Sequence, residues 1–229
     1  MTPSDAIRRL FLQYPDVLVG FADIAYSPFA RQYPSAIVFA VPYGKQLTLE
    51  SYTEADFEAC IQSAKARLEG ILAELEALLD ERHIAHYAPP VAQENETDLL
   101  APFSFKYAAT RAGLGWYGKN DVIVTERYGP RVRLSAVLAD MPLDYGQPIV
   151  ESRCPDDCVK CVEACPCKAL NGVLWNAALR RADLIDYHRC NRMRSAFIPR
   201  LGRKSACGLC LAACPFGGRE GITNCYLKG

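Results

Sequence analysis

The sequence predicts an α/β domain followed by a small cysteine-rich domain, and three observations support this. The first 145 residues alternate short apolar runs typical of strands with amphipathic segments typical of helices. Eight of the eleven cysteines then form a spaced pattern between Cys154 and Cys214. The segment 141–148, which contains two prolines, lies between these regions. We therefore expect an α/β domain at 1–145 and a cysteine-rich domain at 146–229.

The N-terminal third predicts one helix and two strands. Residues 5–14 have the pattern of an amphipathic helix, with Ser4 as the expected N-cap. Strands are expected at 16–24 and at 36–43. The second of these is a continuous apolar run, which is typical of a strand buried on both faces.

The clearest helix is expected at 54–82, where apolar residues recur at intervals of three and four and charged residues lie off that stripe. Thr53 is its expected N-cap. The remaining predictions for this domain are a short strand at 84–87, a helix at 101–112, and a hairpin of strands 121–125 and 132–138 that turns at 128–130.

The cysteine spacing predicts two 4Fe–4S clusters. A cubane cluster needs four thiolates, and three come readily from one tight loop, while a cysteine followed by proline serves the neighbouring cluster. Crossing the two Cys-Pro ligands assigns Cys154, Cys158, Cys161 and Cys214 to the first cluster. The second cluster then takes Cys165, Cys207 and Cys210, with Cys190 from the connecting segment as the candidate fourth ligand.

Zinc and disulfides are the alternatives for these cysteines. Paired CxxC motifs do bind zinc, but zinc explains neither the two CxxxCP sequences nor the third cysteine of the first loop. Disulfides are typical of short secreted chains, and no signal peptide is evident. Because the first gap, from Cys154 to Cys158, is one residue longer than usual, Cys167 is the alternative to Cys154. Cys60, Cys167 and Cys225 are otherwise expected to be free thiols.

Charge and hydropathy exclude some partners. Lysine plus arginine equals aspartate plus glutamate, at 26 each, so no overall field favours nucleic acid or a membrane. No apolar run is long enough to span a bilayer, and oxygen-sensitive clusters suit the reducing cytoplasm, where we expect the protein. A basic run without acidic residues (Arg189, Arg192, Arg194, Arg200, Arg203 and Lys204) is expected to offset cluster charge or to dock an acidic electron donor, rather than to hold RNA.

The run RAGLGWYGKN, from Arg111 to Asn120, has three glycines within six residues around a tryptophan. Such glycines let the backbone approach another group closely. The run is not the dinucleotide-binding fingerprint, which requires GxGxxG directly after a strand. It is either a tight helix-to-strand connection or a ligand-binding loop.

Four features occur together in this order: AIVFAVPYG, RAGLGWYGKN, LSAVLADMPL and the cysteine pattern. This combination resembles the epoxyqueuosine reductase family, iron–sulfur and cobalamin enzymes that share a catalytic core with reductive dehalogenases. The resemblance implies a nitroreductase-like α/β sandwich that binds base-off cobalamin, followed by a ferredoxin-like domain with two 4Fe–4S clusters. A flavin in the α/β domain, or a non-catalytic electron-transfer module, is the alternative.

The resemblance also implies roles for individual residues. The family's acid catalyst is an aspartate upstream of the glycine run; Leu99 stands at that spacing, and Asp98, one residue earlier, is the candidate. The residues implied to line the cofactor are Arg111, Gly113, Gly115, Trp116, Gly118, Lys119 and Asn120.

The resemblance further implies a ferredoxin or flavodoxin as the electron donor. The family's helical-repeat extension, which helps to hold tRNA, has no counterpart before the sequence ends at Gly229. We therefore expect a short form of the family that acts on a small molecule or a modified nucleoside rather than on a whole tRNA.

Overall fold

The computed structural model describes residues 2–45, 47–90, 99 and 101–217. The chain divides into two compact units, and each is built from three separate segments. The sheet unit comprises Met1–Pro42, Ala64–Gly115 and Val132–Ile149, and the cysteine unit comprises Tyr43–Ser63, Trp116–Arg131 and Val150–Gly229. The units therefore interleave along the sequence, whereas the predicted domains 1–145 and 146–229 are continuous.

The sheet unit is built on one antiparallel four-stranded sheet with the order β1-β2-β6-β3. Its strands are β1 (Leu18–Asp23), β2 (Ser35–Pro42), β6 (Val132–Ala139) and β3 (His86–Tyr87). The predicted apolar run is the central strand β2, which is buried along nearly its whole length, as expected for a strand covered on both faces.

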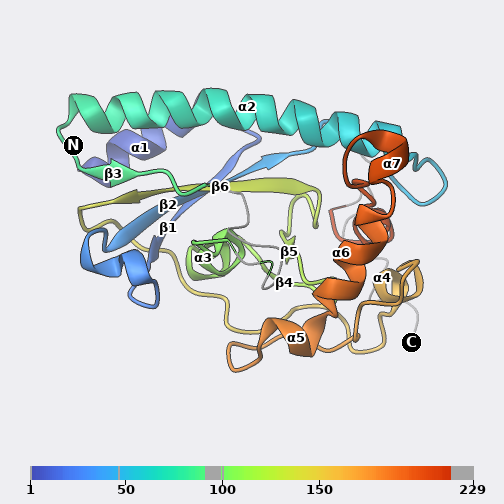
Figure 1. Ribbon diagram of the computed structural model, residues 1–229. Helices are drawn as coiled ribbons and strands as arrows, with labels where there is room; N and C mark the ends of the chain where they lie inside the picture. The colour runs from blue at the N-terminus through green and yellow to red at the C-terminus, as the bar shows by residue number, and fades with distance from the viewer. Residues whose placement is uncertain (1, 46, 91–98, 100, 218–229) are drawn as a thin grey trace. The chain divides into compact units, whose positions relative to one another are not determined.

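Helices cover both faces of this sheet (Figure 1). α1 (Pro3–Phe11) and the part of α2 (Glu54–Glu81) that belongs to this unit lie on one side, and α3 (Phe105–Arg111) lies on the other. α1 contacts the sheet through the rings of Phe11 and Phe39, whose centroids are 5.5 Å apart, and α3 contacts β1, β2 and β6. The α/β class predicted from the sequence is confirmed.

The two predicted N-caps differ in outcome. Thr53 caps α2 as expected, because its Oγ1 accepts the backbone N–H of Asp56 at 3.0 Å. The prediction for Ser4 is wrong: Thr2 caps α1 and forms a reciprocal capping box with Asp5, with Pro3 in the first turn. The Ser4 Oγ instead accepts the backbone N–H of Asp144.

The predicted hairpin of 121–125 and 132–138 is also wrong. β5 (Ile123–Val124) pairs with β4 (Trp116–Tyr117), and β6 pairs with β2 along eight residues. The turn at 128–130 is present, but Thr125 and Gly129 close it by exchanging backbone hydrogen bonds of 2.9 Å. The long apolar β6 gains more by joining the buried strand β2 than by pairing with a two-residue neighbour.

Within its described residues, the cysteine unit contains β4, β5, the first part of α2 and five short helices. These are α4 (Lys160–Glu163), α5 (Arg181–Leu184), α6 (Tyr187–Ser195), α7 (Ile198–Leu201) and α8 (Leu209–Ala212). α4 and α8 follow the two cysteine loops and pack against each other. Across the described residues, no helix is both long and apolar enough to cross a membrane.

Candidate metal centres

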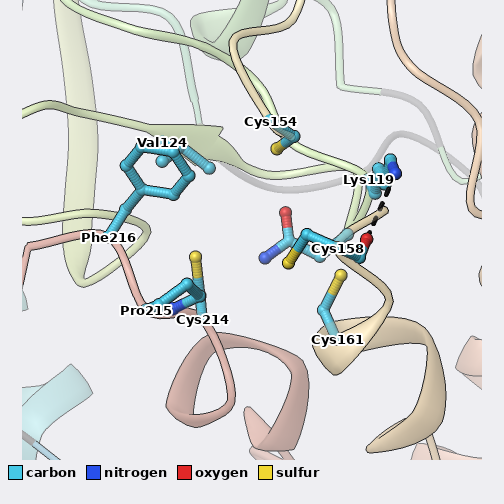
Figure 2. Close-up of a pocket in the computed structure, with 9 residues that line it drawn as sticks. Lys119, Val124, Cys154, Cys158, Cys161, Cys214, Pro215 and Phe216 are labelled. Atoms are coloured by element: carbon cyan, nitrogen blue, oxygen red, sulfur yellow. Dashed lines mark hydrogen bonds between the residues drawn. The ribbon is translucent and has the colours of Figure 1, made fainter. Parts of the chain in front are cut away.

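Four predicted ligands of the first cluster line one cavity of the cysteine unit. Its cysteines are Cys154, Cys158, Cys161 and Cys214, which we call the first cysteine set. Figure 2 shows their sulfur atoms facing a common space. Three of them come from one loop and the fourth from a Cys-Pro sequence more than fifty residues later. Cys167, the alternative to Cys154, is not among the residues that line the cavity.

The predicted ligands of the second cluster also lie near one another. Cys165 is buried in a small apolar cluster, against which Cys190 and Cys210 pack. Burial raises the pKa of Cys210 well above its ordinary value, and the nearby thiols of Cys207, Cys161, Cys190 and Cys165 raise it further. Cys165, Cys190, Cys207 and Cys210, which we call the second cysteine set, are therefore electrostatic neighbours, and Cys161 links them to the first set.

The geometry of these cysteines bears on the zinc and disulfide alternatives. All ten cysteines of the described residues are free thiols, so none of them forms a disulfide. Zinc would draw four sulfurs to within about 3.8 Å of each other, because Zn–S bonds are ~2.3 Å long. Among the described residues, no three histidine, cysteine or acidic side chains converge closely enough to hold a single ion. A cubane, with iron at its corners, would hold its four thiolates farther apart than a single zinc ion does.

The two cysteine loops share a local design. Ser152 stands two residues before Cys154, and its Oγ accepts the Cys154 N–H at 3.3 Å. Ser205 stands two residues before Cys207 and accepts the Cys207 N–H at 3.2 Å. A serine at this spacing forms a turn that fixes the direction of the following cysteine. The repeat of the cysteine motifs therefore extends to the turns that precede them.

The second loop requires glycine at one position. Gly208 has a φ of +80°, and a Cβ there would lie 2.1 Å from the Phe57 ring. Cys207 before it also has a positive φ, of 54°. The hydroxyl of Tyr52 donates a hydrogen bond to the Cys207 carbonyl, and burial raises the pKa of Tyr52. Consecutive left-handed residues turn the chain tightly enough to bring Cys207 and Cys210 together.

A buried lysine holds the first cysteine loop. Lys119 is only 4% exposed, and its Nζ donates to the carbonyls of Pro155 at 3.0 Å, Asp156 at 2.8 Å and Cys158 at 3.1 Å. These three bonds use all the donors of an ammonium group. Lys119 therefore fixes the longer CPDDC loop and brings a positive charge beside the first cysteine set.

A buried arginine holds the other side of the same cavity. Arg131 donates to the carbonyls of Leu211 at 3.0 Å, Cys214 at 3.1 Å and Phe216 at 2.7 Å. Burial lowers the pKa of Arg131, and the Cys214 thiol opposes that shift. Arg131 was missed at the sequence level, because no local pattern marks an arginine whose partners lie eighty residues away.

Without metal, two thiols of the first set, Cys161 and Cys214, favour their neutral form. Burial, followed by the neighbouring Cys154 and Cys158, raises the pKa of Cys161 to about 11. Burial raises the pKa of Cys214 to about 12. Only a positively charged group would stabilise four thiolates here, so metal binding must release protons.

The glycine run contains glycines that allow close packing and a side chain, Asn120, that contacts a cysteine loop. Gly113 and Gly118 allow close packing: added Cβ atoms would lie 2.7 Å from the Gln147 carbonyl oxygen and 2.6 Å from Asn120 Oδ1, respectively. Asn120 Nδ2 donates to the Cys210 carbonyl at 3.3 Å, so Asn120, like Lys119, contacts the cysteine loops. Gly115 is buried.

Two donors of the same run have no acceptor. The Nε1 of Trp116, in the cysteine unit, and the Nε of Arg111, in the sheet unit, are buried and make no hydrogen bond within the described residues. Arg111 lies 3.8 Å from Asp23 through a different nitrogen, and Trp116 packs against the ring of Phe216. Buried donors of this kind are normally satisfied, so a ligand acceptor is a physical explanation for each.

The predicted catalytic residue, Asp98, lies outside the described residues, as does Cys225. Leu99 is described; it is buried, with a positive φ of 52°.

Much of the basic run is used inside the cysteine unit. Arg203 lies 3.0 Å from Glu54 and 3.3 Å from Glu58, and the Arg203 hydrogen bond lowers the pKa of Glu54. Arg194 donates to the Ser205 carbonyl at 2.7 Å, and Lys204 donates to Asn191 at 3.0 Å. These bonds hold the segment that leads into the second loop. Arg192 and Arg200 are exposed.

Comparisons with known proteins find similarity to two groups of enzymes, the epoxyqueuosine reductases and the reductive dehalogenases. No protein-family model matches the chain. An epoxyqueuosine reductase of Cyclobacterium marinum is 37% identical over 90 residues, which are 39% of this chain and 26% of that protein. A tetrachloroethene reductive dehalogenase of Sulfurospirillum multivorans is 33% identical over 119 residues, 47% of this chain and 22% of that protein. An epoxyqueuosine reductase of Bacillus anthracis is 29% identical over 63% of this chain and 36% of that protein.

Solved structures of the same two groups share the fold. An epoxyqueuosine reductase superimposes with a TM-score of 0.62 at 20% identity, covering 95% of this chain and 66% of that one. A catabolic reductive dehalogenase gives 0.69 at 20% identity, covering 96% of this chain and 32% of that one. The chain thus spans less than two thirds of these relatives. Over the part that it spans, the chain resembles the epoxyqueuosine reductase-like family, which is related to the reductive dehalogenases.

Proposed function

We propose that the protein is a reductase that passes single electrons through two 4Fe–4S clusters to a cobalamin held by the α/β domain. The observation that carries this proposal is the first cysteine set: three cysteines of one loop and the distant Cys214 line a single cavity. Such crossing of the last ligand is the pattern of two-cluster ferredoxins. We accordingly propose a ferredoxin-like cluster domain and a nitroreductase-like sandwich as its two parts.

The residues around the cysteines suit anionic clusters. Thiolate-ligated clusters carry net negative charge, and the buried cations Lys119 and Arg131 lie on the backbone of the first set. In the second set, the Ala169 N–H donates to Cys165 Sγ at 3.3 Å, the kind of bond that stabilises a ligating thiolate and tunes cluster potential. Cys161 of the first set belongs to the buried cluster against which Cys210 of the second set packs, and this proximity supports electron transfer between the two clusters.

One unsatisfied donor of the glycine run supports a cofactor in the sheet unit. The Arg111 Nε–H would donate to an acceptor of the bound group, and cobalamin carries many amide acceptors. One matching reductive dehalogenase is B12-dependent. When bound, cobalamin would supply a low-potential cobalt centre, while the chain's part is to hold the group, exclude water and deliver a proton. Asp98 remains the proposed proton donor.

We propose a small molecule or a modified nucleoside as the substrate and a ferredoxin or flavodoxin as the donor. One related epoxyqueuosine reductase has been solved with an epoxyqueuosine-modified tRNA stem loop. Four residues of the basic run, Arg189, Arg194, Arg203 and Lys204, bond to this chain's own groups. The exposed Arg192 and Arg200 are left to meet an acidic donor protein.

A non-catalytic electron-transfer module is the second candidate. Lys119 and Asn120 favour it, because both turn to the cysteine loops and so do not need a cofactor to explain them. A flavin in place of cobalamin is the third. The three candidates predict different absorption bands: corrinoid, flavin, or clusters alone.

Anaerobic reconstitution tests these proposals. The protein is loaded with iron and sulfide, analysed for both, and titrated with cobalamin and separately with flavin. We expect two clusters' worth of iron and a saturable corrinoid spectrum. Arg111→Lys, which keeps the positive charge but removes the Nε–H, should weaken cobalamin binding about tenfold, since a lost hydrogen bond costs ~1–1.5 kcal/mol. Full cluster loading with no binding of cobalamin would favour the electron-transfer module.

A further inference from the structure

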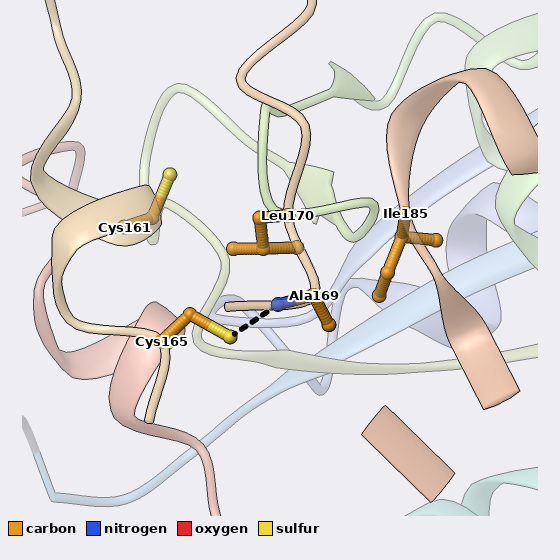
Figure 3. Packing of buried hydrophobic residues seen from close by; sticks show 5 residues of the cluster. All are labelled: Cys161, Cys165, Ala169, Leu170 and Ile185. Atoms are coloured by element: carbon orange, nitrogen blue, oxygen red, sulfur yellow. Dashed lines mark hydrogen bonds between the residues drawn. The ribbon is translucent and has the colours of Figure 1, made fainter. Parts of the chain in front are cut away.

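Cys167, which has no role in either cysteine set, lies beside a predicted ligand. Its Sγ is 3.8 Å from the Sγ of Cys165. Cys167 packs against the buried cluster that contains Cys161 and Cys165, as do Cys190 and Cys210. Figure 3 shows Cys165 in this cluster, with its sulfur directed at the backbone of Ala169. The second cysteine set therefore has a fifth thiol next to it.

A backbone donor lies at this corner. The Ala169 N–H donates to Cys165 Sγ at 3.3 Å. Ala169 belongs to the same buried cluster against which Cys167 packs. The N–H that stabilises a thiolate at Cys165 is therefore close to both cysteines.

The separation of the sulfurs suits exchange rather than a bond between them. A disulfide is ~2.05 Å long, so 3.8 Å is a non-bonded contact. Two sulfurs this close cannot each hold a different iron of a cubane without moving apart, whereas a small shift lets one replace the other on the same iron.

We propose that Cys167 is an alternative thiolate ligand of the second cluster, which binds the iron corner of Cys165 when Cys165 is displaced. This inference rests on the proposed two-cluster function. In the exchange, the Fe–S bond to Cys165 breaks, the Fe–S bond to Cys167 forms, and the Cys167 proton passes to the Cys165 sulfur. No electrons are gained or lost.

The test compares four anaerobically reconstituted proteins: wild type, Cys165→Ala, Cys167→Ala and the double variant. Iron and sulfide are counted, and electron paramagnetic resonance is recorded as prepared and after reduction. Cys165→Ala should keep the wild-type iron and sulfide, with an altered spectrum of one reduced cluster. The double variant should lose the second cluster, about half of the iron, or retain it only as a three-iron centre with a signal in the oxidised state. Cys167→Ala should match wild type.

A matched control is Cys207→Ala, because Cys207 is not among the charged neighbours that shift Cys167. It should lose the second cluster although Cys167 is present. Equal iron and equal spectra in Cys165→Ala and the double variant would overturn the proposal. If Cys165→Ala does not fold, as judged by circular dichroism, the isosteric Cys165→Ser takes its place, with and without Cys167→Ala. A wild-type protein that takes up no cluster would instead refute the two-cluster function itself.

Discussion

Lys119→Met would remove the cation that holds the first cysteine loop. The wild-type Nζ makes three hydrogen bonds of 2.8–3.1 Å to the carbonyls of Pro155, Asp156 and Cys158. Each bond from a charged donor contributes ~1.5–3 kcal/mol, and the cost of burying the ammonium offsets several kcal/mol of the total. We expect a net loss of about 3 kcal/mol, which is on the order of a hundredfold in the equilibrium retention of the first cluster.

The assay is anaerobic competition with an iron chelator. Half of the iron in Lys119→Met, that of the first cluster, should be released at about threefold lower chelator concentration than in wild type, because the ~3 kcal/mol is divided over the four irons that the chelator removes. The iron of the second cluster should be released at the same chelator concentration as in wild type. The first cluster should also be harder to reduce, because a nearby positive charge stabilises its reduced form.

Lys160→Met is the matched control. Lys160 is an exposed lysine in the same motif, directly before Cys161, and no side-chain hydrogen bond of it is among those of the described residues. It should release iron like wild type. The reasoning would fail if Lys119→Met and Lys160→Met released iron alike, or if both clusters were weakened equally.

Three further predictions concern the same unit. Cys214→Ala should lose the first cluster and keep the second, as measured by iron content and electron paramagnetic resonance. Cys60→Ala, which removes a buried thiol outside both sets, should keep both clusters. Two intact clusters in Cys214→Ala would contradict the crossed assignment. Gly208→Ala should destabilise the protein by about 3 kcal/mol in urea denaturation, because its Cβ would both strain the backbone at φ +80° and meet the Phe57 ring. Gly202→Ala, at φ +68° but facing open space, should cost only ~1 kcal/mol. Equal costs would refute the steric argument. In the cluster-free protein, the pKa values of Cys161 and Cys214 are raised to about 11 and about 12, so the folded state binds these two protons more tightly than the unfolded state does. The folded state should therefore be most stable below pH ~9 and lose stability as the pH rises towards those values. A urea midpoint that rises over this pH range would contradict the prediction.

Local patterns predicted the elements whose stability is local. The apolar stripe and Thr53 predicted α2 within one residue at its end, and the apolar run predicted β2 within one residue at each end. The hairpin prediction failed because strand pairing is a long-range choice: β6 joins β2, nearly a hundred residues earlier, instead of its neighbour in sequence. The Ser4 cap failed for a local reason, since Thr2 satisfies the same donors with a reciprocal partner.

The sequence by itself determined which cysteines belong to which loop, because the spacing of thiols along a tight turn limits what they can bind together. Only the tertiary structure decided what surrounds them. The bonds of Lys119 and Arg131 join each side chain to carbonyls at least 36 residues away, and Cys167 proved to lie beside Cys165 rather than at the first cavity. Such contacts depend on how distant segments pack, and a backbone carbonyl, which every residue carries, leaves no mark in the sequence.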